Sequence, residues 1–252
     1  MKVVGVIPAR MASRRFPGKP LAKILGLTMI EHVFRRSALS GALDDIYVAT
    51  CDEEIRAAVE GFGGKALMTS SRHTRCTDRV AEAAEALTSE VIVNIQGDEP
   101  LLDPEMVGAV AAPLRADASL LCTTIIAPLA DASEAADGNV VKVVSAQNGD
   151  VLYFSREPIP SGRMGIQPLS RFKQIGILAF RREFLLRLSR LPETPLEQAE
   201  SVDLLRALEN GYPVRGVLST ARSLGVDTPE DLRRAEEQMR TDPLFEHYAA
   251  AR

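Results

Sequence analysis

Short apolar runs alternate with amphipathic helical patterns through residues 1–120, and this alternation limits the fold more than any other feature. The runs at 3–7, 46–49, 66–68 and 91–95 are apolar enough to be buried strands. The helical patterns lie between and after them, at 29–40, 52–61, 77–86 and from Pro104 onward, where Asp103 is a suitable cap. Strands that alternate with helices are typical of a parallel sheet. We therefore predict an α/β fold of three layers, with a mostly parallel sheet and helices on both faces.

The pattern changes after Leu120. Strands are expected at 122–127, 140–144, 151–154 and 175–180, and Asn148-Gly149-Asp150 is a hairpin signal between the second and third. Residues 155–172 are rich in Pro, Gly and Arg and are predicted to form an excursion. Helices are expected at 184–191 and 196–210, a strand at 214–218, and a final helix after the cap Thr228. We interpret residues 1–252 as one domain with an inserted antiparallel subregion.

Composition excludes several classes of function. A net charge of −4 argues against a general nucleic-acid-binding protein. No apolar run approaches 18 residues and the chain opens on a strand, so we expect neither a signal peptide nor a membrane span. Three widely spaced cysteines suit a reducing cytoplasm, and three scattered histidines do not suggest a zinc site. Any metal should be a hard cation held by carboxylates.

The segment 7–21, IPARMASRRFPGKPL, places four cations in a loop directly after the first strand: Arg10, Arg14, Arg15 and Lys19. Cations this close repel one another unless an anion lies among them. Loops at the carboxyl ends of parallel strands are also where open α/β sheets bind ligands. The segment therefore predicts a polyphosphate site, with a solvated basic loop as the alternative. Neither the P-loop nor the dinucleotide-binding glycine motif occurs.

Two aspartates are candidates for holding Mg²⁺ against a phosphate. Asp98 follows an apolar strand directly, and Asp227 lies between Gly225 and a helix start. Asp98 could instead accept backbone hydrogen bonds in a turn, and Asp227 could cap the helix beside Thr228. The residues alone thus indicate a metal–polyphosphate site, with the two structural roles as alternatives.

Five motifs, in order along nearly the whole chain, resemble those of the 3-deoxy-manno-octulosonate (Kdo) cytidylyltransferases: IPARMASRRFPGKPL, VNIQGDEPLL, NVVKVV, LYFSREPIP and GVDTPEDL. The resemblance implies a nucleotidyltransferase sheet and Mg²⁺-dependent transfer of CMP from CTP to a small acidic acceptor, with release of pyrophosphate. It implies a CTP-binding half at 1–120, an acceptor and dimerisation insertion at 121–215, and a closing metal-ligand strand and helix at 216–252. It also implies a homodimer that makes contact around 140–171.

The resemblance assigns roles to named residues. Asp98 and Asp227 would bind Mg²⁺, and Gln96 would lie between the acceptor and the metal. The segment 73–79, HTRCTDR, occupies the base-recognition loop, although Arg75 and Cys76 stand where Ser and Gly are common. The implied CTP-binding residues are Pro8, Ala9, Arg10, Arg15, Lys19, Thr77, Asp78, Arg79 and Gln96. The implied catalytic residues are Arg10, Arg15, Lys19, Gln96, Asp98 and Asp227.

The acceptor half departs from the family pattern. Gln174 and Leu178 stand where His and Tyr are typical, and Asp203-Leu204 replaces Glu-Gln. The expected acceptor-binding residues are Arg156, Gln174, Glu197 and Glu200. Kdo or a Kdo-like sugar acid is the family's acceptor, but lost polar groups also suit a smaller acid, such as the phosphonoformate used by related phosphonate cytidylyltransferases. The acceptor should be anionic, because cations crowd this region: Arg156, Arg163, Arg171 and Lys173. A non-catalytic nucleotide-binding protein is a third, remote alternative.

Overall fold

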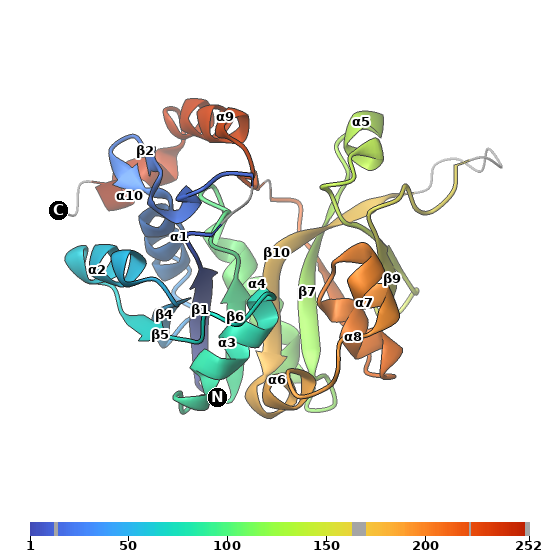
Figure 1. Cartoon of the computed structure of the whole chain (residues 1–252). Helices are drawn as coiled ribbons and strands as arrows, with labels where there is room; N and C mark the ends of the chain where they lie inside the picture. Colours follow the sequence, from blue (N-terminus) through green and yellow to red (C-terminus); the bar gives the residue numbers. More distant parts are fainter. Residues whose placement is uncertain (13–14, 163–169, 222, 250–252) are drawn as a thin grey trace.

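A nine-stranded sheet forms the middle of the computed structural model, which describes residues 1–12, 15–162, 170–221 and 223–249 (Figure 1). Its main path runs β11-β7-β10-β6-β1-β4-β5, with β8 and β9 attached beside β10. The strands are β1 (Val3–Ala9), β4 (Asp45–Thr50), β5 (Ala66–Met68), β6 (Val91–Ile95), β7 (Cys122–Pro128), β8 (Lys142–Ser145), β9 (Val151–Ser155), β10 (Phe172–Arg181) and β11 (Arg215–Leu218).

The first half of the sheet is parallel, as the alternation of strands and helices predicts. β1 pairs in parallel with β4 on one side and β6 on the other, so Val6 lies beside both Tyr47 and Asn94. All seven residues of β1 are buried. A strand that is buried on both faces needs apolar side chains in both directions, which explains the nearly continuous apolar run.

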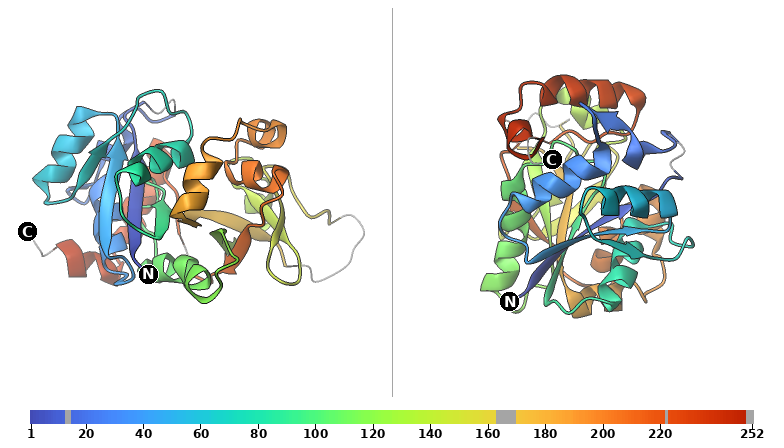
Figure 2. Two further views of the ribbon diagram at one scale, coloured as in Figure 1. Left: turned by 90° about the horizontal axis from the view of Figure 1, so that it is seen from below. Right: turned by 90° about the vertical axis from the view of Figure 1, so that its left-hand side faces the viewer.

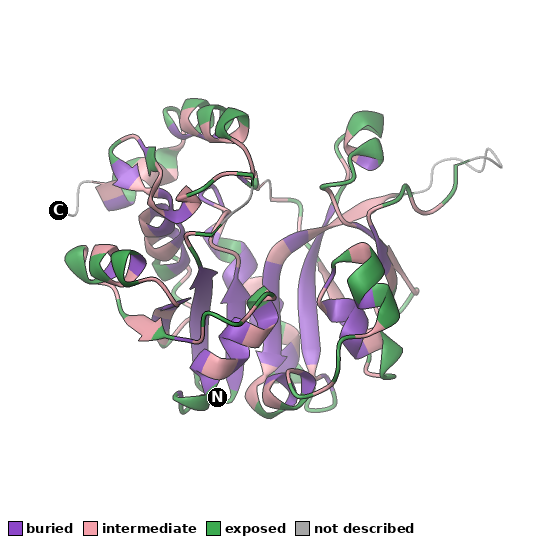
Figure 3. Cartoon of the chain, in the orientation of Figure 1, coloured by how far each residue is buried: buried purple, intermediate pink, exposed green. Residues whose placement is uncertain are grey.

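Helices cover both faces of the sheet (Figures 2 and 3). One buried cluster joins the sheet to α1 (Met29–Ala38), α2 (Glu53–Gly61) and α4 (Pro104–Ala116). A second cluster, on the other face, joins it to α3 (Cys76–Glu85), α6 (Arg182–Leu188) and α8 (Leu204–Glu209). The predicted three-layer α/β fold is confirmed.

The antiparallel subregion is also confirmed. β10 is antiparallel to both β6 and β7, and β8 and β9 form a hairpin beside the start of β10. The hairpin turn contains Gly149 at φ 87°, a left-handed conformation that glycine adopts without steric cost. β11 returns to pair in parallel with β7. One sheet thus contains strands from all three predicted segments, and the division at 120 and 215 remains a prediction.

One helix prediction was wrong. The segment 196–210 is not one helix but α7 (Pro195–Glu200) and α8, separated by a corner at Ser201, which has φ 53°. The C-terminal segment forms α9 (Pro229–Met239), capped by Thr228 as expected, and then a separate α10 (Pro243–Ala249). Short elements that the sequence did not predict are η1 (Lys19–Leu21), β2 (Lys23–Ile24), β3 (Leu27–Thr28) and α5 (Ala132–Ala136). Within the described ranges, no helix is long and apolar enough to cross a membrane.

Candidate active site

Residues from segments far apart in the sequence line one cavity of about 900 Å³. Asp98 and Gln96 follow β6, Gln174 and Lys173 belong to β10, and Asp227 precedes α9. The cavity therefore lies where the carboxyl end of a parallel strand meets the antiparallel part of the sheet. This is the place where open α/β sheets bind ligands.

Lys19 joins the two predicted metal-binding carboxylates. Its Nζ donates to Oδ2 of Asp98 at 2.7 Å and to Oδ1 of Asp227 at 3.2 Å. It also donates to the carbonyl of Val226 at 2.8 Å. Because both carboxylates bind the same ammonium group, they face one point in space, although 129 positions separate them. The structure thus brings together three residues that the sequence singled out.

Backbone contacts hold this arrangement in place. Val226 N donates to the carbonyl of Asp98 at 2.9 Å, which fixes the closing segment beside the end of β6. Gly97 lies so close to β1 that a Cβ there would come within 2.8 Å of the carbonyl oxygen of Pro8. Only glycine permits that approach without a backbone shift. Gly97 therefore lets the chain carry Asp98 close to the end of β1.

Arg15 extends from the basic loop across the cavity. Its guanidinium lies 3.0 Å from Oδ1 of Asp227 and donates to Oδ1 of Asn139 at 2.7 Å. Arg15 thus contacts both Asp227 and the 137–141 segment. Arg14 and Arg163, two further cations of the sequence prediction, lie outside the described residues.

A smaller cavity of about 40 Å³ lies beside the end of β1 and is lined by Pro8, Ala9, Arg10, His73, Thr74, Arg75, Cys76 and Arg79. Arg79 is buried, and its Nη1 donates to Oγ1 of Thr69 at 2.6 Å. Its Nη2 is buried without a hydrogen-bond partner among the described residues. A buried, unpaired guanidinium nitrogen is costly unless a ligand supplies an acceptor. Arg10 lies on the wall of the same cavity.

Cys76 and Thr77 lie at the start of α3, where this loop meets the larger cavity. Cys76 is exposed, and the nearby carboxylates of Asp203 and Asp98 raise the pKa of its thiol. Thr77 N donates to Oδ2 of Asp203 at 3.2 Å. Asp78 does not line either cavity and instead accepts from Arg206 at 3.0 Å. The expected nucleotide contact by Asp78 therefore does not fit the structure.

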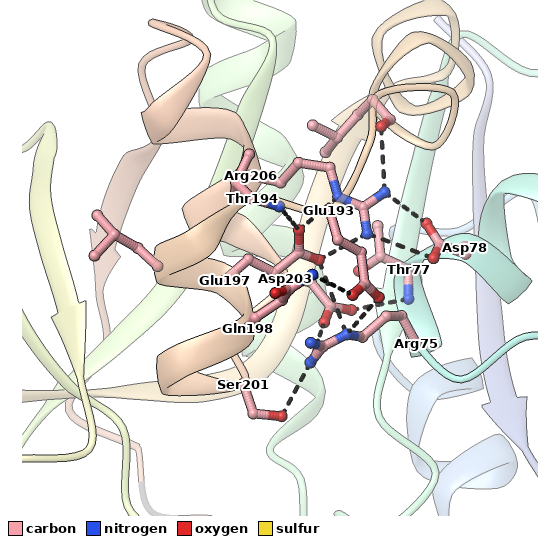
Figure 4. Close-up of polar contacts among 12 residues, drawn as sticks. Arg75, Thr77, Asp78, Glu193, Thr194, Glu197, Gln198, Ser201, Asp203 and Arg206 are labelled. Atoms are coloured by element: carbon pink, nitrogen blue, oxygen red, sulfur yellow. Dashed lines mark hydrogen bonds and ion pairs between the residues drawn. The ribbon is translucent and has the colours of Figure 1, made fainter.

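Two expected acceptor-binding residues bind other parts of the protein. Glu197 has no exposed surface, and both of its carboxylate oxygens accept from Arg206, at 2.7 and 2.8 Å (Figure 4). Glu200 accepts from Ser155 Oγ and from the backbone N of Arg156, both at 2.7 Å. Neither glutamate lines the cavity. Direct contact between these carboxylates and an acceptor is therefore not what the structure supports.

Arg156 lines the cavity, but its guanidinium is occupied by backbone carbonyls. Nε donates to Glu200 O at 2.6 Å, and Nη1 donates to Gly138 O at 2.9 Å. The prediction of an acceptor-binding arginine thus corresponds to a cross-link between α7 and the 137–141 segment. Gln174 does face the cavity, and its amide donates to Thr124 Oγ1 at 3.3 Å.

Glu99 is a cavity residue to which the sequence gave no role. Its carboxylate accepts from the Ser223 hydroxyl. Burial and the neighbouring charge of Asp98 raise the pKa of Glu99 to about 7. The only signal in the sequence was its position directly after Asp98, which does not show where its side chain points. The sequence likewise does not show where the side chains of Arg206 and Asn139 point, so neither was predicted as a site residue.

The carboxylates fit a magnesium ion in part. No group of three His, Cys, Asp or Glu side chains able to hold a metal occurs among the described residues. However, Mg²⁺ in nucleotide enzymes is typically bound by one or two carboxylates, with phosphates and water as its other ligands. Asp98 and Asp227 supply the two carboxylates, and they share a charged partner at one end of the cavity.

Comparison with a solved structure identifies the fold. The fold of the chain is similar to that of the 4-diphosphocytidyl-2C-methyl-D-erythritol synthase of Anaerococcus prevotii, at a TM-score of 0.62 over 95% of this chain and 98% of that one. At 15% identity this likeness concerns the fold alone. The fold is that of the nucleotidyltransferases.

The family is defined by closer matches. Residues 4–221 match the family described as cytidylyltransferase. The chain is 52% identical over 240 residues to the 3-deoxy-manno-octulosonate cytidylyltransferase of Myxococcus xanthus, covering 95% of this chain and 97% of the relative. It is 49% identical over 248 residues to that of Syntrophotalea carbinolica, covering 95% and 99%. The chain belongs to the 3-deoxy-manno-octulosonate cytidylyltransferase family and is a nucleotidyltransferase enzyme.

A solved structure agrees. The CMP:2-keto-3-deoxy-manno-octonic acid synthetase complexed with CTP superimposes with a TM-score of 0.90 at 40% identity, covering 95% of this chain and 99% of that chain. The resemblance inferred from five sequence motifs is thereby confirmed. Membership of an enzyme family leaves the non-catalytic alternative without support.

Proposed function

We propose that the protein catalyses Mg²⁺-dependent transfer of CMP from CTP to Kdo or a closely related sugar acid, with release of pyrophosphate. The observation that carries this proposal is that Asp98 and Asp227 line one cavity and both pair with the ammonium group of Lys19. The names of the relatives support CTP as the donor and Kdo as the acceptor. A volume of about 900 Å³ suits two substrates better than one small acid.

The basic loop would hold the triphosphate. Arg10, Arg15 and Lys19 follow the end of β1 and lie on the walls of the two cavities or beside them. In the reaction a hydroxyl oxygen of the acceptor forms a bond to the α-phosphorus of CTP. The bond from that phosphorus to the bridging oxygen of the β-phosphate breaks, and pyrophosphate leaves with the electron pair. Fixed cations offset the charge that grows on the leaving group.

Asp98 and Asp227 would hold the magnesium. Mg²⁺ there would neutralise charge on the phosphates and make the acceptor hydroxyl more acidic. Gln96 lies on the cavity wall beside Asp98, where its amide can orient the acceptor. Arg79, with its unpaired Nη2, is the candidate for an acceptor atom of the cytosine ring.

The acceptor assignment follows the relatives. A phosphonate acceptor gains no support from them, since the named relatives are Kdo enzymes. Leu178 and Leu204 nevertheless line the cavity together with Gln174, at the three positions where polar groups are typical of the family. We therefore expect the contacts to the sugar hydroxyls to differ in detail from those of the typical family pattern.

The test is pyrophosphate release from CTP with Mg²⁺, scanned over Kdo, sialic-acid-like sugars and phosphonoformate. Turnover should be strongest with Kdo and should stop when EDTA removes the metal. Asp98→Asn and Asp227→Asn should abolish release while melting temperatures stay near that of the wild type. Normal turnover in both variants would sink the metal assignment, and faster turnover with phosphonoformate than with Kdo would overturn the acceptor.

We further propose that the protein is a cytoplasmic homodimer. Three cysteines that form no disulfide are consistent with a reducing compartment. The expected contact region, 140–171, contains Leu152, whose side chain on β9 is 63% exposed. Leu152 is a position at which this expected contact can be tested.

A further inference from the structure

Arg75 lies on the wall of both cavities. Its Cα belongs to the loop between β5 and α3, immediately before Cys76 on the nucleotide side. Its guanidinium points away from this loop and contacts the segment around α7 (Figure 4). Only 15% of this side chain is exposed. Arg75 therefore spans the boundary between the proposed CTP and acceptor sites.

The contacts of Arg75 converge on the corner between α7 and α8. Nη1 donates to Ser201 Oγ at 2.9 Å and lies 3.7 Å from Asp203 Oδ1. Nε donates to Glu193 Oε1 at 3.3 Å. Asp203 in turn accepts from Thr77 N, on the same loop as Arg75. Two side chains therefore join the corner to the nucleotide loop. Arg75 reaches from the loop to the corner, and Asp203 reaches from the corner to the loop.

This corner needs external support. Ser201 has a left-handed backbone at φ 53°, which costs an L-residue roughly 1–2 kcal/mol. Arg75 holds its hydroxyl, while Arg156 donates to the carbonyls of Glu200 and Ser201. Strained corners persist where surrounding contacts over-determine them.

The same corner forms part of the cavity wall. Ser201, Val202, Asp203 and Leu204 all line the large cavity, next to Gln174 and Leu178 of β10. A shift of the corner would therefore change the shape of the cavity where the acceptor is proposed to lie. Any movement of the loop 73–79 on nucleotide binding would reach the corner through Arg75.

We propose that Arg75 is a positioning residue that couples CTP binding to the acceptor-binding corner 201–204. This inference rests on the proposed function of the two cavities. It assigns a specific role to an arginine that stands where serine is common in the family pattern. Arg75 acts through Ser201 and Asp203 and takes no part in bond making or breaking.

The test compares Arg75→Ser, Arg75→Lys and the control Arg72→Ser. Arg72 is exposed in the same loop, and its side chain donates only to Ser70 Oγ among the described contacts. At saturating CTP, Arg75→Ser should raise KM for the acceptor about tenfold, within the usual range of coupling between sites, whereas the Kd of CTP measured without acceptor should change less than twofold. Arg75→Lys should recover part of the loss, because an ammonium can reach a carboxylate but cannot bridge several groups.

Amide hydrogen exchange distinguishes coupling between the two sites from a purely structural role of Arg75. In the wild type, CTP with Mg²⁺ should slow amide exchange both at 73–79 and at 193–204. In Arg75→Ser, the slowing should persist at 73–79 and vanish at 193–204. Equal slowing at both segments in this variant, or an acceptor KM equal to that of Arg72→Ser, would overturn the inference. Failure of wild-type CTP binding or turnover would instead refute the proposed function.

Discussion

Lys19 is the residue at which burial and charge oppose each other most clearly. Burial alone lowers the pKa of its ammonium, but the ion pairs with Asp98 and Asp227 outweigh that effect and the net pKa is raised. Lys19 therefore stays charged throughout the neutral range. A permanently charged group beside two carboxylates can hold them in place and still interact with a phosphate.

Lys19→Met should lower kcat for pyrophosphate release by roughly 100- to 1,000-fold, the usual cost of removing one fixed group that stabilises transition-state charge. Methionine keeps most of the aliphatic length, so packing should change little. The matched control is Lys23→Met, an exposed lysine four residues along the same segment. Steady-state kinetics with CTP and Kdo measure the effect, and a kcat within threefold of the control variant would contradict the role.

At the scale of elements, most of the fold could be predicted because strand and helix signals are local. The apolar run at 3–7 and the Asp103-Pro104 cap gave β1 and the start of α4 directly. The break between α7 and α8 could not be predicted, because the corner at Ser201 depends on Arg75 and Arg156, which are distant in the sequence.

The same limit applies to the site. Position after a buried strand was enough to find Asp98, and a cluster of cations was enough to find Lys19. Motifs identify Glu197 and Arg156 as well, but they do not show that the first is buried against Arg206 or that the second binds backbone carbonyls. Lys142 is a similar case, since its buried ammonium donates to the carbonyls of Asp137 and Val140. Side-chain direction depends on tertiary packing.

Arg206 links α8 to α7 and α3, so its loss should destabilise the junction of these helices. Arg206→Met leaves the fully buried Glu197 without its nearest cation, which should cost about 3–5 kcal/mol of unfolding free energy. The double variant Arg206→Met/Glu197→Leu should recover most of that loss, because apolar replacements remove the unpaired charge.

Urea unfolding of the two single variants and the double variant gives the coupling free energy. Arg187→Met serves as the control, since this arginine is exposed on α6 and surface changes usually cost less than about 0.5 kcal/mol. Additive losses in the double variant would show that the Arg206–Glu197 pair does not act as a unit.

For the whole molecule, His32 connects overall stability to pH. It is buried on α1, where its ring nitrogens bind Tyr248 OH of α10 and the carbonyl of Ile24, each at 2.8 Å. Burial, with smaller contributions from Arg36 and Arg35, lowers its pKa to about 4. Below pH 6.5 the unfolded chain therefore binds a proton that the folded protein does not.

The free energy of unfolding should thus fall as the pH drops from 6.5 toward 4, by up to about 3 kcal/mol from this group. Urea unfolding at pH 7, 6 and 5 should show a smaller decline in His32→Gln than in the wild type. His247→Gln is the control, because that histidine is exposed near the C-terminus. Identical pH dependence in wild type and His32→Gln would contradict the assignment.

The proposed homodimer is the last property that belongs to the whole molecule. If residues 140–171 form the contact, Leu152 leaves water on association, and an arginine there places an unpaired charge in the interface. Sedimentation velocity at micromolar concentration should give a dimer for the wild type and a shift toward monomer for Leu152→Arg. Leu39→Arg, at an exposed leucine after α1 and outside that segment, should remain dimeric. A monomeric wild type contradicts the dimer, whereas a dimeric Leu152→Arg places the contact away from Leu152, because an arginine buried in the interface would weaken association.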